Sequence, residues 1–335
     1  MAHNLINSLA RRSFLKLNQT EHYPVLYREV HQFTNDYLSY KDTSKSVYQF
    51  LDCTFGGGNH SVPLLEKHQN LRVLGLDLDS KVMNECKTHY KEYICQKRLA
   101  LEHTNFVHAQ HIDPRQAFNK KIGITQKHDI VLLDLGFSSY QLEDIERGFS
   151  YMGNDDQPLD MRFNIHSPDQ STAMDIINGA TELELCEILK KFGEERFHTL
   201  LAQKIVEGRV KLGKVKTTGD LKQVIREGFP NSARDEKNQM IKRAFQALRI
   251  ATNYELLNLQ KFMESAPQHV VEPNGLMMVI TFHSLEERIV SQYLNKWRKN
   301  KMGDFGAKKP LEPSALEVEE NSRSKSAKLF TFVFS

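Results

Sequence analysis

The sequence predicts an α/β fold in which a mostly parallel sheet carries helices on both faces and is interrupted by a helical insertion. Apolar runs of strand length alternate with helix-length segments in the first and last thirds of the chain, which is typical of parallel sheets. Between about residues 142 and 243 the strand pattern stops and helical stretches follow one another. The length of 335 residues suits about two domains.

Each expected element follows from a local pattern. Buried strands are expected at short apolar runs, at 47–52, 72–77, 105–108 (a weak run), 129–134, 276–282 and 328–334. Helices are expected at 60–68, from Ser80 to the early nineties, and at 181–191, 194–207, 254–264 and 284–299. Residues 300–327 are polar and are expected to form a loop.

Composition excludes several classes of protein. Hydrophobic residues make up 40% of the chain and charged residues 26%, as in an ordinary globular protein. No apolar run approaches the roughly 20 residues of a membrane helix. Four cysteines lie far apart without a CxxC pair, which excludes a disulfide scaffold and disfavours a cysteine zinc site.

The first 20 residues have the composition of a mitochondrial transit peptide. They contain Arg11, Arg12 and Lys16, several apolar residues and serines, and no acid. We therefore expect the mature protein in the mitochondrial matrix. An ordinary chain terminus, with a cytoplasmic protein, is the alternative.

Three acids and a glycine loop mark the expected ligand site. Asp52, Asp77 and Asp134 each end a predicted strand, and a three-glycine run at 56–58 follows the first strand. Open α/β sheets bind ligands beyond the carboxyl ends of their strands, and an acid about 20 residues past the loop suits a ribose diol. The pattern predicts a site for a nucleoside cofactor.

The loop favours S-adenosylmethionine over a dinucleotide. A dinucleotide site needs GxGxxG, but counted from Gly56 the third glycine position is Ser61. Asp52 before the loop would repel a pyrophosphate, whereas acids suit the amino and sulfonium groups of S-adenosylmethionine. A nicotinamide oxidoreductase is therefore disfavoured.

Eight sequence runs, in matching order, resemble the bacterial RsmH (MraW) methyltransferases. The resemblance extends from about residue 22 to the C-terminus, and the eight runs together are highly specific. The runs are 54–61 (TFGGGNHS), 132–142 (LLDLGFSSYQL), 146–152 (ERGFSYM), 158–162 (PLDMR), 193–197 (GEERF), 245–250 (FQALRI), 282–290 (FHSLEERIV) and 321–329 (NSRSKSAKL).

The resemblance implies a fold, a reaction and a domain plan. The fold is a Rossmann-like class I S-adenosylmethionine-dependent methyltransferase sheet with an inserted helical domain. The reaction is methylation of N4 of a cytosine in small-subunit ribosomal RNA, here by a mitochondrial counterpart. The plan is a methyltransferase domain at 22–141 and 244–335 with a substrate-binding insertion at 142–243, preceded by the transit peptide that composition predicts at 1–20.

The resemblance also implies cofactor-binding residues. These are Gly58, Asn59, His60, Asp77, His111, Asp134 and Gln141. Three positions depart from the bacterial pattern: Asn59 replaces a glycine, His111 an aromatic residue and Tyr140 a proline. Asparagine tolerates positive φ, so the first change is expected to be harmless, whereas His111 weakens the expected contact on the adenine side.

No catalytic residue is assigned. Phe137 is a candidate for stacking on the base, and Ser138 or Ser139 for accepting a hydrogen bond from N4, but both serines are equally suited to shaping the loop. His283 is a candidate for touching substrate or for capping the following helix. No residue pattern calls for a metal.

Basic stretches indicate an RNA partner. Residues 204–249 hold twelve Lys or Arg against five acids, and residues 296–328 hold nine against five. Such stretches suit phosphates, although each lysine could equally belong to a solvated face. The partner is expected to be small-subunit ribosomal RNA or the assembling small subunit, with no membrane; the oligomeric state, a dimer included, stays open. A catalytically silent RNA-binding assembly factor on the same fold is the alternative function.

Overall fold

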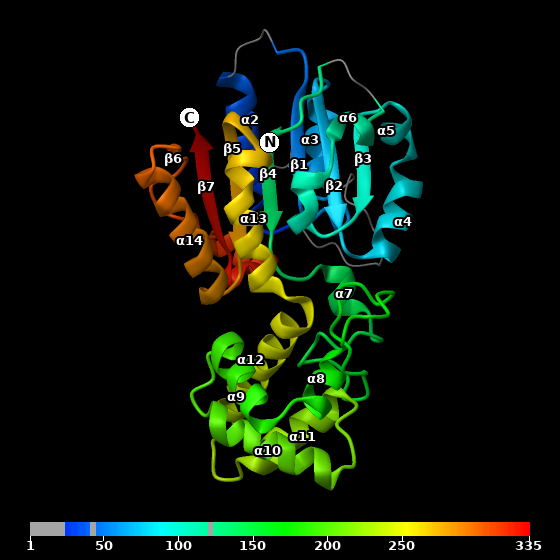
Figure 1. Cartoon of the computed structure of the whole chain (residues 1–335), viewed down its shortest axis with the longest axis vertical. Coiled ribbons are helices and arrows are strands. Elements are labelled where there is room, and N and C mark those ends of the chain that lie inside the picture. Colours follow the sequence, from blue (N-terminus) through cyan, green and yellow to red (C-terminus); the bar gives the residue numbers. More distant parts are fainter. Residues whose placement is uncertain (1–23, 41–44, 120–122) are drawn as a thin grey trace. The chain divides into compact units, whose positions relative to one another are not determined.

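The computed structural model describes residues 24–40, 45–119 and 123–335. The expected transit peptide at 1–20 lies outside the described residues. The chain forms two compact units (Figure 1): the first combines the described residues up to Gly136 with Leu256–Ser335, and the second is Phe137–Glu255. The insertion expected at 142–243 falls within the second unit.

A seven-stranded sheet forms the centre of the first unit. Its strands are β1 (Tyr48–Asp52), β2 (Leu71–Asp77), β3 (Leu99–His103), β4 (His128–Asp134), β5 (Val271–Thr281), β6 (Gly303–Phe305) and β7 (Lys328–Phe334). The order is β3-β2-β1-β4-β5-β7-β6, which begins like a Rossmann sheet. Only β7 pairs antiparallel with its neighbours. The Rossmann-like class I methyltransferase fold predicted from the sequence is confirmed.

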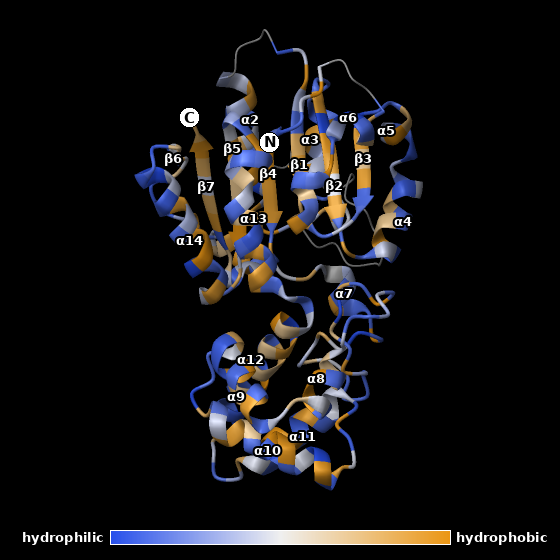
Figure 2. Cartoon of the chain, in the orientation of Figure 1, coloured by the Kyte–Doolittle hydropathy of each residue, from blue (hydrophilic) through white to orange (hydrophobic). Residues whose placement is uncertain are grey.

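Helices cover the sheet and build the second unit. The first unit contains α2 (Tyr27–Tyr40), α3 (Ser61–Lys67), α4 (Ser80–His89), α5 (Lys91–Cys95), η1 (Phe106–His111), α6 (Pro114–Ala117), α13 (Glu255–His269), α14 (Ser284–Lys299), α15 (Ala315–Glu320) and η2 (Ser322–Ser326). The second contains α7 (Ser139–Glu143), α8 (Ala173–Gly179), α9 (Glu182–Gly193), α10 (His198–Lys211), α11 (Thr218–Gly228) and α12 (Arg234–Asn253). Figure 2 shows strands that are hydrophobic along most of their length and helices with one hydrophobic side, as expected of elements that bury one face.

The predicted third strand at 105–108 is wrong. Those residues lie in the 3-10 helix η1, whose first turn is capped by the Asn105 side chain accepting from the Val107 amide at 3.0 Å. The third strand is instead β3, in which Leu99, Ala100 and Leu101 are buried. Residues 99–103 form the strand because they are buried beside β2, whereas the weak apolar pattern at 105–108 does not lead to a strand.

Other segments refine the predictions. The expected elements at 284–299 and 328–334 are confirmed as α14 and β7. The expected helix at 194–207 begins later, at His198, because Glu194 adopts a left-handed φ of +49° that ends α9. The expected loop at 300–327 contains β6, α15 and η2, and α2 was not predicted.

The second unit has its own hydrophobic core. Buried residues of α8 to α12, among them Ile177, Leu189, Ile205 and Phe245, pack together. Thr172, Thr181 and Thr217 each begin a helix with a reciprocal capping box, which satisfies free amides at the helix start. The unit is therefore built like an independent helical domain.

Candidate functional site

The glycine loop after β1 is held in a single shape by its own packing. Gly56 and Gly58 have φ of +50° and +75°, a region that glycine enters without strain. A Cβ at Gly58 would lie 2.6 Å from Phe55 Cζ and 2.8 Å from Val62 Cγ2. Asn59 does not adopt a positive φ. The backbone at this position therefore suits asparagine as well as the glycine of the bacterial pattern.

Asp77, at the end of β2, ties the loop to the sheet. Its Oδ2 accepts from the Gly56 amide at 2.7 Å and its Oδ1 from the Asp79 amide at 2.8 Å. Burial raises the pKa of this carboxyl, and the two amides oppose that rise. An ionised carboxylate has about four acceptor positions, so Asp77 can still accept hydrogen bonds from a ligand.

Asp134 and His60 face each other at the same edge. The Asp134 amide donates to Thr54 Oγ1 at 2.7 Å, which fixes the end of β4 beside the loop. His60 Nε2 lies 3.4 Å from Asp134 Oδ2. Both ring nitrogens of His60 and Asp134 Oδ1 are buried without a hydrogen-bond partner among the described residues. Buried polar atoms without partners are costly, so this group is suited to a polar ligand.

Asp52 is the most deeply buried of the three acids. It is 1% exposed, and burial raises its pKa to about 6, against the opposing effects of the Ser61 hydroxyl, His60 and the Thr54 amide. A positive group nearby would favour its ionised form. The edge thus combines one deeply buried carboxylate with two further acids.

Thr54 and His31 are site residues that sequence reasoning missed. His31, on α2, contacts the His60 carbonyl through Nε2 at 3.0 Å. Burial lowers its pKa to about 3, so the ring is neutral at physiological pH. Thr54 belongs to the run 54–61, which could have indicated it. His31 lies on α2, which was not predicted, so no sequence signal placed it at this site.

Two predicted cofactor residues, His111 and Gln141, have contacts with their own neighbours in the chain. His111 ends η1, is exposed, and contacts Gln110 Nε2 at 3.1 Å. Gln141 belongs to the second unit, where its Oε1 accepts from the Ser138 amide at 2.9 Å in a capping box. The structure therefore gathers Gly58, Asn59, His60, Asp77 and Asp134, and the roles of His111 and Gln141 stay predictions.

His283 caps a helix. Its Nδ1 accepts from the Glu286 amide at 3.4 Å, and Glu286 Oε2 accepts from the Phe282 amide at 2.8 Å. His283 Nε2 also lies 3.3 Å from Glu286 Oε1. These contacts confirm the capping role that the sequence suggested for this histidine.

The loop candidates Phe137 and Ser138 are already engaged within the second unit. The Phe137 ring stacks on Phe149 at a centroid distance of 5.6 Å, and the Arg249 guanidinium lies 5.0 Å from its centroid. Ser138 caps α7. Capping and ring packing favour a loop-shaping role for both residues.

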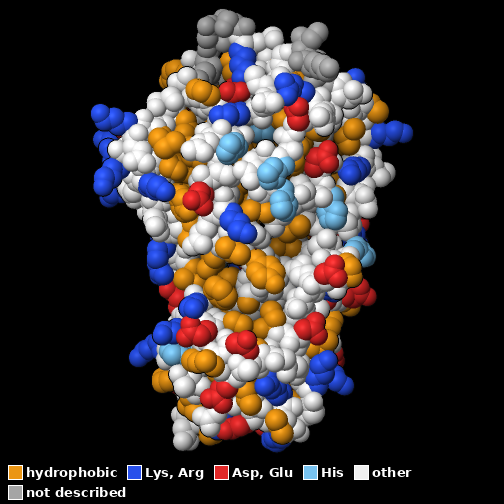
Figure 3. All heavy atoms as spheres, viewed as in Figure 1, with side chains coloured by type: hydrophobic (Ala, Val, Ile, Leu, Met, Phe, Trp, Pro, Cys, Tyr) orange, Lys and Arg blue, Asp and Glu red, His pale blue; other side chains and the backbone are white. Residues whose placement is uncertain are grey.

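Acids neutralise part of the basic stretch at 204–249. Lys222, Arg243 and Arg249 pair with Asp155, Glu195 and Glu255, three acids outside that stretch. On the face shown in Figure 3, Lys and Arg side chains of the second unit alternate with Asp and Glu side chains. The positive charge available to a partner is therefore smaller than the sequence count suggests.

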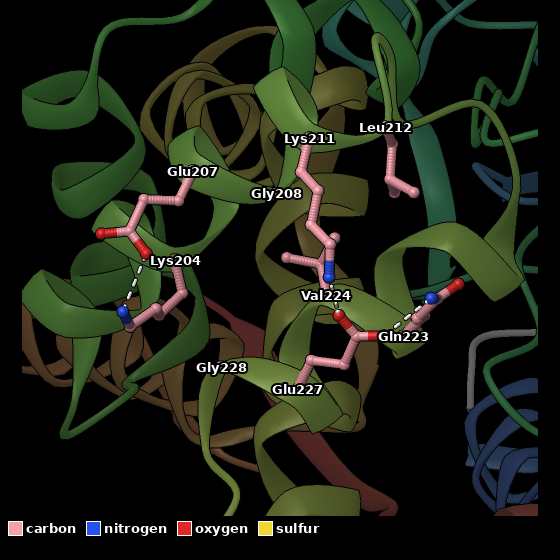
Figure 4. A pocket seen from close by; sticks show the side chains of 9 residues that line it. All are labelled: Lys204, Glu207, Gly208, Lys211, Leu212, Gln223, Val224, Glu227 and Gly228. Atoms are coloured by element: carbon pink, nitrogen blue, oxygen red, sulfur yellow. Dashed lines mark hydrogen bonds and ion pairs between the residues drawn. The ribbon is translucent and has the colours of Figure 1, made fainter.

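A small pocket of about 200 Å³ lies between α10 and α11 (Figure 4). Lys204 pairs with Glu207, and Lys211 pairs with Glu227, each at 2.8 Å. Gln223 donates to the same Glu227 at 2.7 Å. Because its lysines are paired, the pocket has no excess positive charge for a phosphate.

Among the described residues, none of the helices has the length and the apolar composition that a membrane span requires.

Comparison with known proteins places the chain among methyltransferases. Its residues 19–334 match the MraW methylase family. It is 36% identical over 309 residues to "Ribosomal RNA small subunit methyltransferase H" of Sulfurihydrogenibium azorense (strain DSM 15241 / OCM 825 / Az-Fu1), with 92% of this chain and 97% of the relative covered. The protein of the same name from Clostridium botulinum (strain Kyoto / Type A2) is 37% identical over 326 residues, with the same two coverages. Similarity of this extent over nearly the whole length means that the chain belongs to the MraW methylase family.

Proposed function

We propose that this protein is an S-adenosylmethionine-dependent methyltransferase that methylates N4 of a cytosine in small-subunit ribosomal RNA. The observation that carries the proposal is the family match over residues 19–334. Relatives that cover 92% of the chain are named as methyltransferases of small-subunit ribosomal RNA. The resemblance of eight sequence runs to the RsmH methyltransferases supports the cytosine N4 as the acceptor.

The residues at the carboxyl edge of the sheet fit the proposed cofactor. S-adenosylmethionine carries a methyl group on a positively charged sulfur, together with an amino acid group and a ribose diol. Asp77 keeps acceptor positions free for a diol. His60 and Asp134 hold buried polar atoms that have no hydrogen-bond partner among the described residues. Asp52 supplies negative charge whose burial cost a cationic ligand would offset.

The chain's contribution to the reaction is mainly positioning. The lone pair of N4 is delocalised into the cytosine ring, so the amine is a weak nucleophile, and holding it in line with the methyl group supplies much of the rate. The base must leave its stack to reach a buried donor. We propose that the loop following Asp134 orients the base, and we assign no general base.

Methyl transfer to small-subunit ribosomal RNA tests the proposal. The purified protein would be incubated with labelled donor and either naked small-subunit RNA or small-subunit particles lacking the modification. We expect label on one cytosine, located by mass spectrometry of RNA fragments. Donor binding measured by calorimetry without any transfer would favour the silent assembly factor. Absence of donor binding at millimolar concentration would reject the cofactor proposal.

We further propose that the protein acts in the mitochondrial matrix. The support is the basic, acid-free composition of residues 1–20. A reporter fused behind these residues is expected to enter mitochondria, whereas the same fusion with Arg11, Arg12 and Lys16 changed to glutamate should stay outside. A wild-type fusion that stays in the cytosol would support the cytoplasmic alternative.

A further inference from the structure

The first unit carries a basic surface that the proposed cofactor site does not use. Residues 296–309 contain six Lys or Arg and one acid. The six cations are all exposed; four of them, Lys296, Arg298, Lys299 and Lys301, lie at the end of α14, and we call these four the α14 basic surface. The other two, Lys308 and Lys309, belong to the segment that runs back along β7 to the pairing of Leu311 with Leu329, and they are not part of it. The single acid, Asp304, lies 2.9 Å from Arg298. Figure 3 shows Lys and Arg side chains gathered where Figure 1 places α14 and β6.

The backbone beneath this surface is firmly held. Trp297 is 3% exposed and packs on Phe332 and Phe334, with centroid distances of 5.6 Å and 5.3 Å. The helix ends in a Schellman motif: Lys301 N donates to the Arg298 carbonyl and Met302 N to the Trp297 carbonyl, both at 3.0 Å. The charges therefore project from an ordered helix end.

This surface lies at the opposite edge of the sheet from Asp77 and Asp134. α14 begins just after the carboxyl end of β5 and runs for 16 residues, about 24 Å at 1.5 Å per residue. β7 starts beside that carboxyl end, with Lys328 opposite Thr281, and reaches Gly303 at its other end, where it pairs through Phe334. Phosphates bound there cannot belong to the nucleotide whose base reaches the carboxyl edge.

We propose that the α14 basic surface binds the phosphate backbone of a ribosomal RNA duplex distant from the modified cytosine. An anionic membrane is disfavoured, because membrane-surface helices insert an apolar face, and the apolar face of α14, including Ile289, Val290 and Leu294, is buried. No large apolar side chain of residues 284–309, all of which are described, is among the exposed ones. The identity of the polyanion as ribosomal RNA rests on the proposed function.

Replacing three of the lysines tests the surface directly. The variant Lys296→Gln/Lys299→Gln/Lys301→Gln would be compared with wild type for binding to a labelled 20-base-pair RNA duplex from about 50 to 200 mM salt. We expect at least tenfold weaker binding at the low-salt end and a salt slope reduced by up to about three, one per lost phosphate contact. The matched control is Lys87→Gln/Lys91→Gln/Lys97→Gln. It removes three exposed lysines in and after α4 and α5, near the outer strand β3 and far from β6, and it should bind like wild type.

A pair of single variants separates charge from folding. Lys301 and Lys97 both follow a helix end and have left-handed φ values of +58° and +54°, where glycine is usually found. Lys301→Gly and Lys97→Gly should each leave the melting temperature unchanged or raised. Only Lys301→Gly should weaken duplex binding, by a few-fold, with a salt slope lower by about one.

Several outcomes would overturn the inference. Equal losses in the two triple variants would show that only net charge matters, and no loss in the α14 variant would show that the surface is not used. Binding of phosphatidylserine vesicles in place of the duplex would assign the surface to a membrane. Failure of the proposed function shows instead as absence of methyl transfer and of donor binding by the wild type, and leaves the duplex measurement intact.

Discussion

Single residues at the carboxyl edge of the sheet are buried at a cost in stability and have polar atoms that can still bond a ligand. Asp52 is fully enclosed, and Asp77 bonds the glycine loop through one oxygen and the Asp79 amide through the other. His60 and Asp134 keep buried atoms without hydrogen-bond partners among the described residues. Each arrangement lowers the stability of the folded chain unless a ligand is bound. Such compromises are typical of binding sites.

Replacing Asp52 should stabilise the fold in a pH-dependent way. Its pKa is raised to about 6 by burial, so folding favours the protonated form, and its contribution is intact below about pH 4 and lost as the pH rises through 6. Asp52→Asn should therefore match wild type near pH 4 and be more stable by roughly 3 kcal/mol at pH 7.5. Urea unfolding at several pH values measures this; a less stable variant at pH 7.5 would contradict the assignment.

Replacing Asp77 should weaken donor binding and also release the Gly56 amide that holds the glycine loop. Asp77→Ala removes a carboxylate that can accept hydrogen bonds from a diol, and bonds to charged groups contribute about 1.5–3 kcal/mol. We expect a 10- to 100-fold increase in the dissociation constant for S-adenosylmethionine by calorimetry. Lys87→Gln, on the outer side of α4, is the control and should bind the donor like wild type.

Gly58 is expected to tolerate no side chain. A Cβ there would lie 2.6 Å from Phe55 Cζ, and the φ of +75° adds strain. Gly58→Ala should lower the free energy of unfolding by about 2 kcal/mol or more and weaken donor binding. Asn59→Ala in the same loop requires no positive φ and serves as the comparison in the same unfolding experiment; equal effects would show that the loop backbone is not restrictive.

At the scale of elements, helix ends hold several of the polar residues that the sequence motifs singled out. His283 and Glu286 close the first turn of α14 immediately after β5. Ser138 and Gln141 do the same for α7. From the sequence motifs alone, these polar residues could equally have been assigned to substrate binding. The structure shows that they cap helices.

The role of His283 can be tested by exchanging one cap for another. His283→Ala should lose about 1 kcal/mol of stability, whereas His283→Asn should retain most of it, since asparagine is a good N-cap. Methyl transfer should be near wild type in His283→Asn. A large loss of activity in both variants, at unchanged stability of the asparagine form, would show that the histidine touches substrate.

Elements with strong local patterns were predictable from sequence, and elements defined by tertiary partners were not. α14 has both an amphipathic pattern and a capping residue, and β7 is mostly apolar, so both were placed correctly. β3 was missed because Leu99–His103 is recognisable as a strand only beside β2. In the site, Gly58 and Asp77 stand at strand ends that the sequence shows, whereas the contact of His31 with His60 depends on how α2 packs.

At the scale of the whole molecule, charge is distributed differently from what a sequence count suggests. Cations of residues 204–249 are neutralised by acids from distant parts of the chain, such as Asp155 and Glu195. Lys214 and Lys216, by contrast, are exposed and form no ion pair within the described residues. Only unpaired charges release counterions when they meet phosphates.

Charge reversal in the second unit should reflect this pairing. Lys214→Glu/Lys216→Glu should weaken RNA binding and lower the salt slope by about two. Lys211→Glu should have a smaller effect per charge, because Lys211 already pairs with Glu227 at 2.8 Å. Affinity for small-subunit RNA measured across salt concentrations decides this, and unchanged affinity of the double variant at every salt concentration would exclude this segment from the interface.

The division of the first unit into two chain segments has a consequence for biogenesis. β4 receives β5 as its neighbour, with Asp134 opposite Ile280, so the whole of Phe137–Glu255 must emerge from the ribosome before the sheet can be completed. During that interval the half-built sheet presents an open apolar edge, while the contiguous helical unit can fold from local contacts. Newly made chains should therefore depend on chaperones mainly in this window, and destabilising changes in β5 should reduce yield more than comparable changes in α9 to α11.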